Sequence, residues 1–285
     1  MRSSWPRGSG AGMPGSGMRF VAGRILRNEE RGGIFYRLVA EIPAPVRFVP
    51  GQFAMVSGWP GNDPLLPRPL AVFRSGKKKE FGTVEFVYKV VGRGTALLSG
   101  LHHGDSLSLT LPLGRGFDLA EEGRRFWLVG GGVGFSSVFP AAVSLGRRRI
   151  GHEIFLGAKT RAHLPPREWT PGGAGPGRIH LCTEDGSAGF RGRVTEAVLE
   201  RLSSLSEGEA ARLTILACGP WPMLKELAAS ALRKGVSIQV ALENHMACGF
   251  GVCWGCVVSL RDGEGTAYRR VCREGPVFDG REVVW

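Results

Sequence analysis

The chain has 285 residues, of which 43% are hydrophobic, and carries a formal net charge of +12. This length provides for two ordinary domains, or for two and a small third one. No run of about 18 apolar residues occurs, so we expect no membrane-spanning helix. The arginines are scattered along the whole chain and do not alternate with aromatic residues, so the positive charge does not predict nucleic-acid binding.

Residues 1–17 are rich in glycine, serine and proline and lack the apolar segment of a secretory signal. We expect a disordered tail over this range. Four of the six cysteines lie near the C-terminus, whereas a secreted disulfide framework spreads its cysteines and follows a signal peptide. The cysteines therefore indicate a cytoplasmic protein with a metal site.

Residues 18–116 consist of short apolar-rich runs separated by glycine, proline and charged residues. The runs lie at residues 19–29, 34–42, 52–58, 70–75, 83–92 and 105–114. Short runs at this spacing, with turn residues between them, are typical of antiparallel strands. We expect a small antiparallel β-barrel over residues 18–116.

Strand-like and helix-like segments alternate in the next part of the chain. Buried-strand patterns lie at 125–130, 152–160, 177–186 and 212–220, and amphipathic helical patterns at 192–205 and 221–235. This alternation predicts a doubly wound parallel sheet, which we place in a Rossmann-like nucleotide-binding domain over residues 117–240. The remaining residues, 241–285, are expected to form a small cysteine-rich domain.

Two stretches of the barrel region are suited to phosphate groups. Arg68 precedes a proline, so its cation is carried on a stiff, extended backbone. Residues 92–95, Gly-Arg-Gly-Thr, provide bare backbone amides and a hydroxyl beside a helix start, which can cradle a pyrophosphate. Each motif alone has a simpler alternative, an ordinary Arg-Pro pair or a turn, and their order along the chain carries more weight.

Two further turns are suited to a nucleotide. Residues 128–140 predict a strand, a glycine turn and a helix whose N-terminus offers free amides to a diphosphate. Residues 217–224 end a buried strand with Cys-Gly-Pro and open another helix. The alternatives are an ordinary tight turn and a buried core cysteine. The choice between NAD and NADP stays open, because Lys159 and Arg161 can form a basic pocket for a 2′-phosphate.

Four cysteines near the C-terminus follow the pattern C-x4-C-x2-C-x15-C, at Cys248, Cys253, Cys256 and Cys272. The first three match the plant-type ferredoxin spacing for a [2Fe–2S] cluster. Glycines between them relieve crowding in such a loop, and a short hairpin can return the fourth. A zinc site is the alternative, although zinc favours two C-x2-C pairs and only one is present. Phe250, Trp254 and Met246 are expected to shield the cluster from water.

The order of these motifs resembles the ferredoxin–NADP reductase superfamily. The resemblance implies that FAD is lined or flanked by Arg68, Pro69, Leu70, Ala71, Val87, Tyr88 and Lys89, with its phosphates held by Gly94 and Thr95. It also implies that a nicotinamide dinucleotide binds at Gly131, Gly132, Gly134, Cys218, Gly219 and Pro220. Many members carry serine at the position of Ala71, and alanine has no hydroxyl with which to form a side-chain hydrogen bond to the flavin ring.

Residues 18–285 look like the electron-transfer subunits of NAD-dependent (class 1B) dihydroorotate dehydrogenases. The stretches "ENHMACGFGVCWGC" and "YRRVCREGPVFDG" are the most diagnostic part of this resemblance. Such a resemblance implies a partner, an FMN-containing catalytic subunit that oxidises dihydroorotate in UMP biosynthesis, in a heterotetramer of two of each. Electrons would pass through the [2Fe–2S] cluster and FAD to NAD+. No catalytic side chain is expected, since the protein positions cofactors.

Two alternatives remain at this point. One is the flavin and iron–sulfur subunit of a related NAD(P)H–ferredoxin or sulfide oxidoreductase complex. The other, of a different class, is a zinc-stabilised binding module without flavin.

Overall fold

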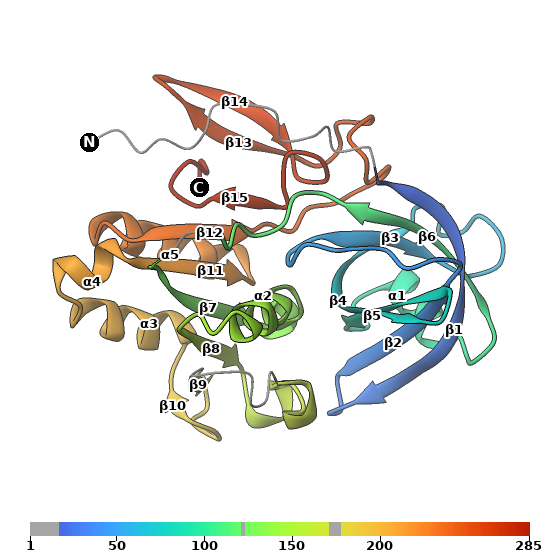
Figure 1. Ribbon diagram of the computed structural model, residues 1–285, viewed down its shortest axis with the longest axis horizontal. Helices are drawn as coiled ribbons and strands as arrows, with labels where there is room; N and C mark the ends of the chain where they lie inside the picture. Colours follow the sequence, from blue (N-terminus) through green and yellow to red (C-terminus); the bar gives the residue numbers. More distant parts are fainter. Residues whose placement is uncertain (1–16, 121–122, 171–177) are drawn as a thin grey trace.

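The computed structural model describes residues 17–120, 123–170 and 178–285. The predicted tail, residues 1–17, lies outside this range except for Gly17. Figure 1 shows a barrel at the right, a sheet with its helices at the left, and a C-terminal hairpin at the top. This is the expected architecture of an antiparallel barrel followed by a parallel sheet and a small C-terminal region.

The barrel consists of six strands closed into a ring. In ring order they are β1 (Arg19–Arg31), β2 (Phe35–Ile42), β5 (Phe81–Tyr88), β4 (Arg68–Lys78), β3 (Phe53–Ser57) and β6 (Ser106–Leu113). Alternation along β6 shows why these residues form strands, since Leu107 and Leu109 are buried inside while Ser106 and Ser108 face solvent. Closure leaves no unpaired sheet edge. Helix α1 (Arg93–Ser99) follows β5.

A seven-stranded sheet forms the second region. Its order is β10 (Phe190–Arg191), β9 (Arg178–Thr183), β8 (His152–Ala158), β7 (Arg125–Gly131), β11 (Leu213–Cys218), β12 (Ser237–Ala241) and β15 (Val277–Asp279). All neighbours are parallel except β15, which runs antiparallel to β12. The predicted parallel sheet is confirmed, and the C-terminal segment adds a strand to it.

Helices cover both faces of this sheet (Figure 1). On β7, Phe126 and Leu128 belong to the core with α2 (Phe135–Arg147), whereas Trp127 and Val129 belong to the core with α3 (Val194–Ser203) and α5 (Trp221–Arg233). Because successive strand residues face opposite sides, a continuous apolar run serves both layers. The short elements are α4 (Glu207–Ala211), η1 (Gly132–Gly134), η2 (Arg161–His163) and η3 (Arg167–Trp169).

An aromatic cluster joins the barrel to the sheet. Phe35 of the barrel packs edge-on against Phe135 of α2, with ring centroids 5.1 Å apart, and Phe135 lies 5.1 Å from Phe139. Phe73 of β4 lies 6.2 Å from Trp169 of η3. Buried aromatic pairs of this kind contribute about 0.5–1.5 kcal/mol each beyond their area. The cluster therefore fixes the orientation of the two regions whose facing loops form the cavities below.

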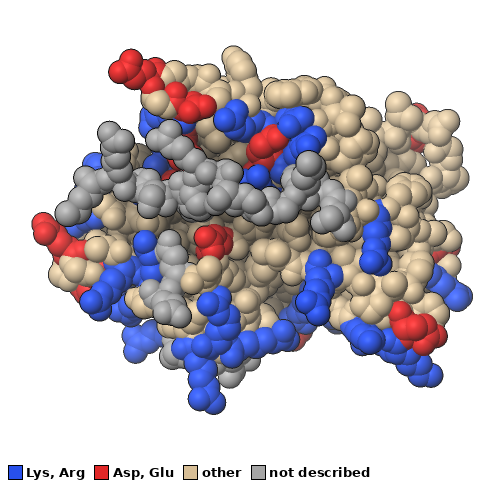
Figure 2. Space-filling model, turned by 45° about the horizontal axis from the view of Figure 1, so that its top comes forward, with Lys and Arg blue, Asp and Glu red and all other residues tan. Residues whose placement is uncertain are grey.

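The hairpin of β13 (Val257–Asp262) and β14 (Gly265–Arg270) returns the chain to the cysteine loop, as predicted. The amide of Val271 donates to the carbonyl of Cys256 at 2.9 Å, so Cys272 follows beside Cys256. Within the described residues, none of the helices has the length and apolar character needed to cross a bilayer. Figure 2 shows lysine and arginine side chains distributed over the visible face of the molecule, with carboxylates among them.

Candidate cofactor sites

A cavity of about 350 Å³ lies at the open side of the barrel and faces the first turn of α2. Apart from Gly94, every residue predicted to bind FAD lines it, together with Cys218 of the sheet: Arg68, Pro69, Leu70, Ala71, Val87, Tyr88, Lys89 and Thr95. We refer to it as the flavin cavity. The structure thus brings together motifs that are separated in the sequence.

Gly94 shapes this site through Arg68. A Cβ atom at position 94 would lie 2.3 Å from Nε of Arg68, so only glycine lets the guanidinium rest on the loop. The guanidinium also donates to the carbonyl of Leu66 and lies 5.5 Å from the ring centroid of Trp59. No carboxylate within the described residues pairs with Arg68. Its remaining N–H groups are therefore free to meet a phosphate.

The hydroxyl of Thr95 orders the loop at the start of α1. Its oxygen accepts from the amides of Val91 at 3.0 Å and Gly92 at 3.2 Å, and its proton is donated to the carbonyl of Gly92 at 2.9 Å. The hydroxyl thus makes all of its hydrogen bonds, two accepted and one donated, within the loop. We infer that Thr95 supports the loop that the sequence assigned to the phosphates, rather than donating to them.

Asn28 is a supporting residue that the sequence did not indicate. Its Nδ2 donates to the carbonyls of Leu98 at 2.8 Å and Leu101 at 2.9 Å, and its Oδ1 accepts from the hydroxyl of Tyr88 at 3.0 Å. One amide therefore links β1, the flavin cavity and the end of α1. Burial raises the pKa of Tyr88, although its bond to Asn28 acts in the opposite direction.

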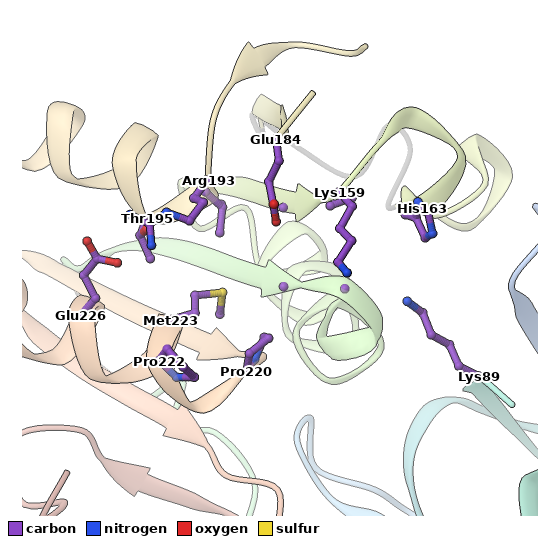
Figure 3. Close-up of a pocket in the computed structure, with 15 residues that line it drawn as sticks. Lys89, Lys159, His163, Glu184, Arg193, Thr195, Pro220, Pro222, Met223 and Glu226 are labelled. Carbon is purple, nitrogen blue, oxygen red and sulfur yellow. The ribbon is translucent and has the colours of Figure 1, made fainter. Parts of the chain in front are cut away.

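A second cavity of about 490 Å³ lies above the carboxyl ends of the parallel strands, and we refer to it as the nucleotide cavity (Figure 3). Gly131, Gly132 and Pro220, which the sequence assigned to the nicotinamide dinucleotide, line it. Lys89 lines both cavities and stands where they meet.

The other predicted nucleotide residues hold the two turns together. A Cβ atom at Gly134 would lie 2.2 Å from the carbonyl oxygen of Cys218, and one at Gly219 would lie 3.1 Å from the backbone of Gly131. Gly134, Cys218 and Gly219 do not line the nucleotide cavity. The two glycines permit the close approach of the turns, and Cys218 faces the flavin cavity instead.

Glu243 is a second residue that the sequence did not single out. It lines the flavin cavity two residues beyond β12 and interacts with Cys218. Burial raises the pKa of the Cys218 thiol to about 12, with Glu243 acting in the same direction and a hydrogen bond from Ser137 against it. The thiol is therefore protonated at neutral pH. Glu243 is exposed at the cavity wall, yet the surrounding protein desolvates its carboxyl and raises its pKa.

The four cysteines lie close enough to interact with one another. Cys248 interacts with Cys253, and Cys272 interacts with Cys248 and with Cys256, whose Sγ lies 3.4 Å from the amide of Cys272. In the described ranges, no three histidine, cysteine or carboxylate side chains converge as they do on a single metal ion. Four neighbouring thiols match the donor set of a [2Fe–2S] cluster, which takes four cysteine ligands.

Backbone amides point at the sulfur of Cys248. Burial opposes ionisation of this thiol, but amides of Cys253, Phe250 and Val252 donate to it and lower its pKa to about 6. Gly249 and Gly251 adopt φ angles of +79° and +90°, in the region that favours glycine. The donor set and the loop therefore fit an anionic iron–sulfur cluster.

Two expectations about this loop were wrong. At Gly255 an added Cβ would make only an ordinary 3.5 Å contact with Sγ of Cys253, and it is Trp254 that takes a positive φ of +57°. Phe250 and Trp254 do not shield the cysteines, because they are 42% and 53% exposed. Arg270 holds Trp254 from one side, with its guanidinium 4.4 Å from the ring centroid.

Comparison with known proteins agrees with this geometry. Residues 243–284 match the family model described as the iron–sulfur cluster binding domain of dihydroorotate dehydrogenase B. The chain is 38% identical over 264 residues to the "dihydroorotate dehydrogenase B (NAD(+)), electron transfer subunit homolog" of Aquifex aeolicus, covering 91% of this chain and 96% of that protein. The corresponding electron transfer subunit of Bacillus caldolyticus is 39% identical over 250 residues, covering 87% and 90%.

Solved structures show the same fold. An NADH-dependent reduced ferredoxin–NADP oxidoreductase, described in the context of flavin-based electron bifurcation, superposes with a TM-score of 0.75 at 29% identity, covering 92% of this chain and 90% of that one. The ferredoxin reductase of carbazole 1,9a-dioxygenase gives a TM-score of 0.64 at 22% identity, covering 77% and 66%, and shares the fold.

Proposed function

Because the chain belongs to the family of electron transfer subunits of dihydroorotate dehydrogenase B, we propose that it transfers electrons from a dihydroorotate-oxidising partner to NAD+. In this proposal the partner carries FMN, two copies of each subunit assemble, and the complex serves UMP synthesis. Among the described residues all six cysteines are free thiols, which fits the reducing cytoplasm.

One observation carries the proposal. From Ala241, the last residue of β12, the chain runs along the wall of the flavin cavity through Glu243 and Met246, and two residues later it reaches Cys248. Gly249 packs against Met55 of the barrel, since an added Cβ would lie 2.3 Å from Cγ of Met55. The cysteine loop therefore lies beside the flavin cavity, and electron transfer between two bound groups requires that they lie close together.

The hydrogen-bond donors that line the two cavities fit FAD and a nicotinamide dinucleotide. When bound, a [2Fe–2S] cluster carries single electrons, whereas FAD accepts them singly and gives up hydride. Arg68 and the amides of the loop before α1 would hold the flavin phosphates, and Gly131 and Gly132 would leave room for the diphosphate of NAD. The neutral thiol of Cys218 provides a small, uncharged part of the wall of the flavin cavity.

We propose that the partner docks on the exposed side chains of the cysteine loop. Phe250, Val252 and Trp254 are 42%, 69% and 53% exposed and surround the exposed Cys253. Apolar and aromatic side chains of this kind are enriched in the centres of protein interfaces. Burying them under the partner would exclude water from the exposed side of the cysteine loop.

The test uses the full chain purified without oxygen, with FAD, iron and sulfide restored. We expect flavin bands together with broad visible absorption, and NADH oxidation by an artificial acceptor. Dihydroorotate should be oxidised only after the FMN-bearing partner is added. A colourless zinc protein would contradict the cofactor assignment, and dihydroorotate turnover by the chain alone would contradict the two-subunit arrangement.

A related NAD(P)H–ferredoxin oxidoreductase complex is the second candidate, because of the structural similarity at a TM-score of 0.75. The same preparation separates the two. Reduction by ferredoxin, with no response to dihydroorotate and the FMN-bearing partner, would favour this alternative.

A further inference from the structure

We propose that Glu184 and Glu226 make the nucleotide cavity selective for NAD over NADP, by placing two carboxylates around the adenosine ribose. The proposal rests on the proposed function, since it assumes that this cavity receives the nicotinamide dinucleotide. It goes further by assigning the choice between the two dinucleotides to named side chains.

The cavity is cationic at the end nearest the barrel. Lys89 and Lys159 both line it, and in Figure 3 their ammonium groups point toward each other beside the glycine turn. Desolvation, and then the charge of Lys159, lower the pKa of Lys89, which places the two cations close together. Neither lysine has an ion-pair partner within the residues that the structure describes. A diphosphate between them would meet two cations and the backbone of the glycine turn.

Carboxylates line the same cavity farther from the barrel. Glu184 follows β9 and points into the cavity, and Glu226 of α5 lies at the opposite side of the view from Lys89, next to Thr195 (Figure 3). With the diphosphate at the glycine turn and the nicotinamide toward the flavin cavity, the adenosine half extends in this direction. An acidic side chain after a strand of a nucleotide-binding sheet accepts hydrogen bonds from the ribose hydroxyls of NAD and opposes a 2′-phosphate.

The cation beside these carboxylates is already neutralised. Nε of Arg193 donates to Oε1 of Glu196 at 3.0 Å. This hydrogen bond, and then the charges of Glu226 and Glu184, raise the pKa of Arg193. The guanidinium of Arg193 is thus paired with Glu196 and also interacts with the charges of Glu226 and Glu184, so carboxylates outnumber it on the side of the cavity where NADP would place its extra phosphate.

The basic pocket considered from the sequence does not form. Lys159 lines the cavity, but its ammonium group points toward Lys89, on the side of the cavity away from Glu226. Arg161 is exposed and does not line the cavity, and its backbone amide donates to Oγ of Ser187 at 2.7 Å. Asp185, the other acidic residue of this turn, accepts from the amide and hydroxyl of Ser187. Glu184 is thus the acidic residue of this loop that is turned to the cavity.

The test compares Glu184→Gln, Glu226→Gln and the double variant with the wild-type chain. Glutamine keeps the shape of glutamate, and neither position is buried, so folding should be retained. Glu200→Gln is the matched control, since it removes one exposed carboxylate from α3 that does not line the nucleotide cavity. Dissociation constants for NAD+ and NADP+ are measured by calorimetry on the full chain, and kcat/KM for NADH and NADPH with an artificial acceptor.

Wild-type protein should prefer NAD+ to NADP+ by at least tenfold. Each single variant should shift this ratio toward NADP+ by about tenfold, which corresponds to about 1.4 kcal/mol, and the double variant by more. Glu200→Gln should leave it unchanged. Equal binding of both dinucleotides by wild-type protein, or variants that match the control, would overturn the inference and leave the proposed function standing. If neither NAD+ nor NADP+ bound, both the inference and the proposed function would be overturned.

Discussion

The amide of Asn28 provides the sharpest test of how the flavin cavity is supported. Replacing it by alanine removes two bonds to the carbonyls of Leu98 and Leu101 and leaves the buried hydroxyl of Tyr88 without its acceptor. A neutral hydrogen bond contributes about 1 kcal/mol, and an unsatisfied buried group costs about 1–3 kcal/mol. We therefore expect Asn28→Ala to lower the free energy of unfolding by about 3 kcal/mol.

Thermal unfolding and flavin fluorescence measure the two consequences. A loss of this size lowers the Tm by roughly 6–12 °C. FAD should also dissociate more readily, because the end of α1 and Tyr88 lose a common support. Tyr88→Phe breaks only one of the three bonds and should cost about 1 kcal/mol. Asn62→Ala, at an exposed loop position, is the control and should change neither quantity. An Asn28→Ala protein with wild-type Tm and FAD affinity would refute the reasoning.

Three further changes test the other sites. Cys253→Ser should remove the iron and sulfide but leave FAD bound, as absorption spectra will show, whereas loss of both cofactors would contradict the assignment. Arg68→Ala should weaken FAD binding by about 1–3 kcal/mol, and unchanged flavin occupancy on dilution would argue against its phosphate contact. Burial of Glu153 opposes its ionisation, but His180 and Arg201 outweigh this and lower its pKa. Glu153→Gln should therefore lose about 1.5–3 kcal/mol at neutral pH, a difference from wild type that shrinks as the pH falls below the usual glutamate pKa; urea unfolding at pH 7 and pH 4 will show whether it does.

Short-range patterns were sufficient for the architecture. Short apolar-rich runs separated by turn residues predicted the barrel strands. Glycine turns between strand-like and helix-like segments predicted the β–α turns, and C-x4-C-x2-C predicted the cysteine loop. In each case the signal lies within about fifteen residues and reflects local backbone geometry. The hairpin that returns Cys272 follows from the same logic.

Residues that act across the fold could not be found in this way. Asn28 lies 60 residues from Tyr88, and its role arises only when the barrel closes. The exposure of Phe250 and Trp254 was not foreseen, because apolar composition predicts burial unless another chain supplies the cover. Glu184 and Asp185 are adjacent and chemically alike, and only the bonds that Asp185 makes to Ser187 separate their roles.

Strand β15 limits how this architecture can be recombined. Its backbone pairs with β12 through Gln239, Val240 and Ala241, and the nearby amide of Leu242 donates to the carbonyl of Pro276 at 2.9 Å. A graft that exchanged everything after residue 241 would also exchange one edge of the host's own sheet. Without a matching strand, β12 would present unpaired amides and carbonyls to other molecules, which promotes aggregation. The C-terminal region is thus hydrogen-bonded into the parallel sheet through β15. We expect a transplant between homologous subunits to succeed only when β12 and β15 are exchanged together.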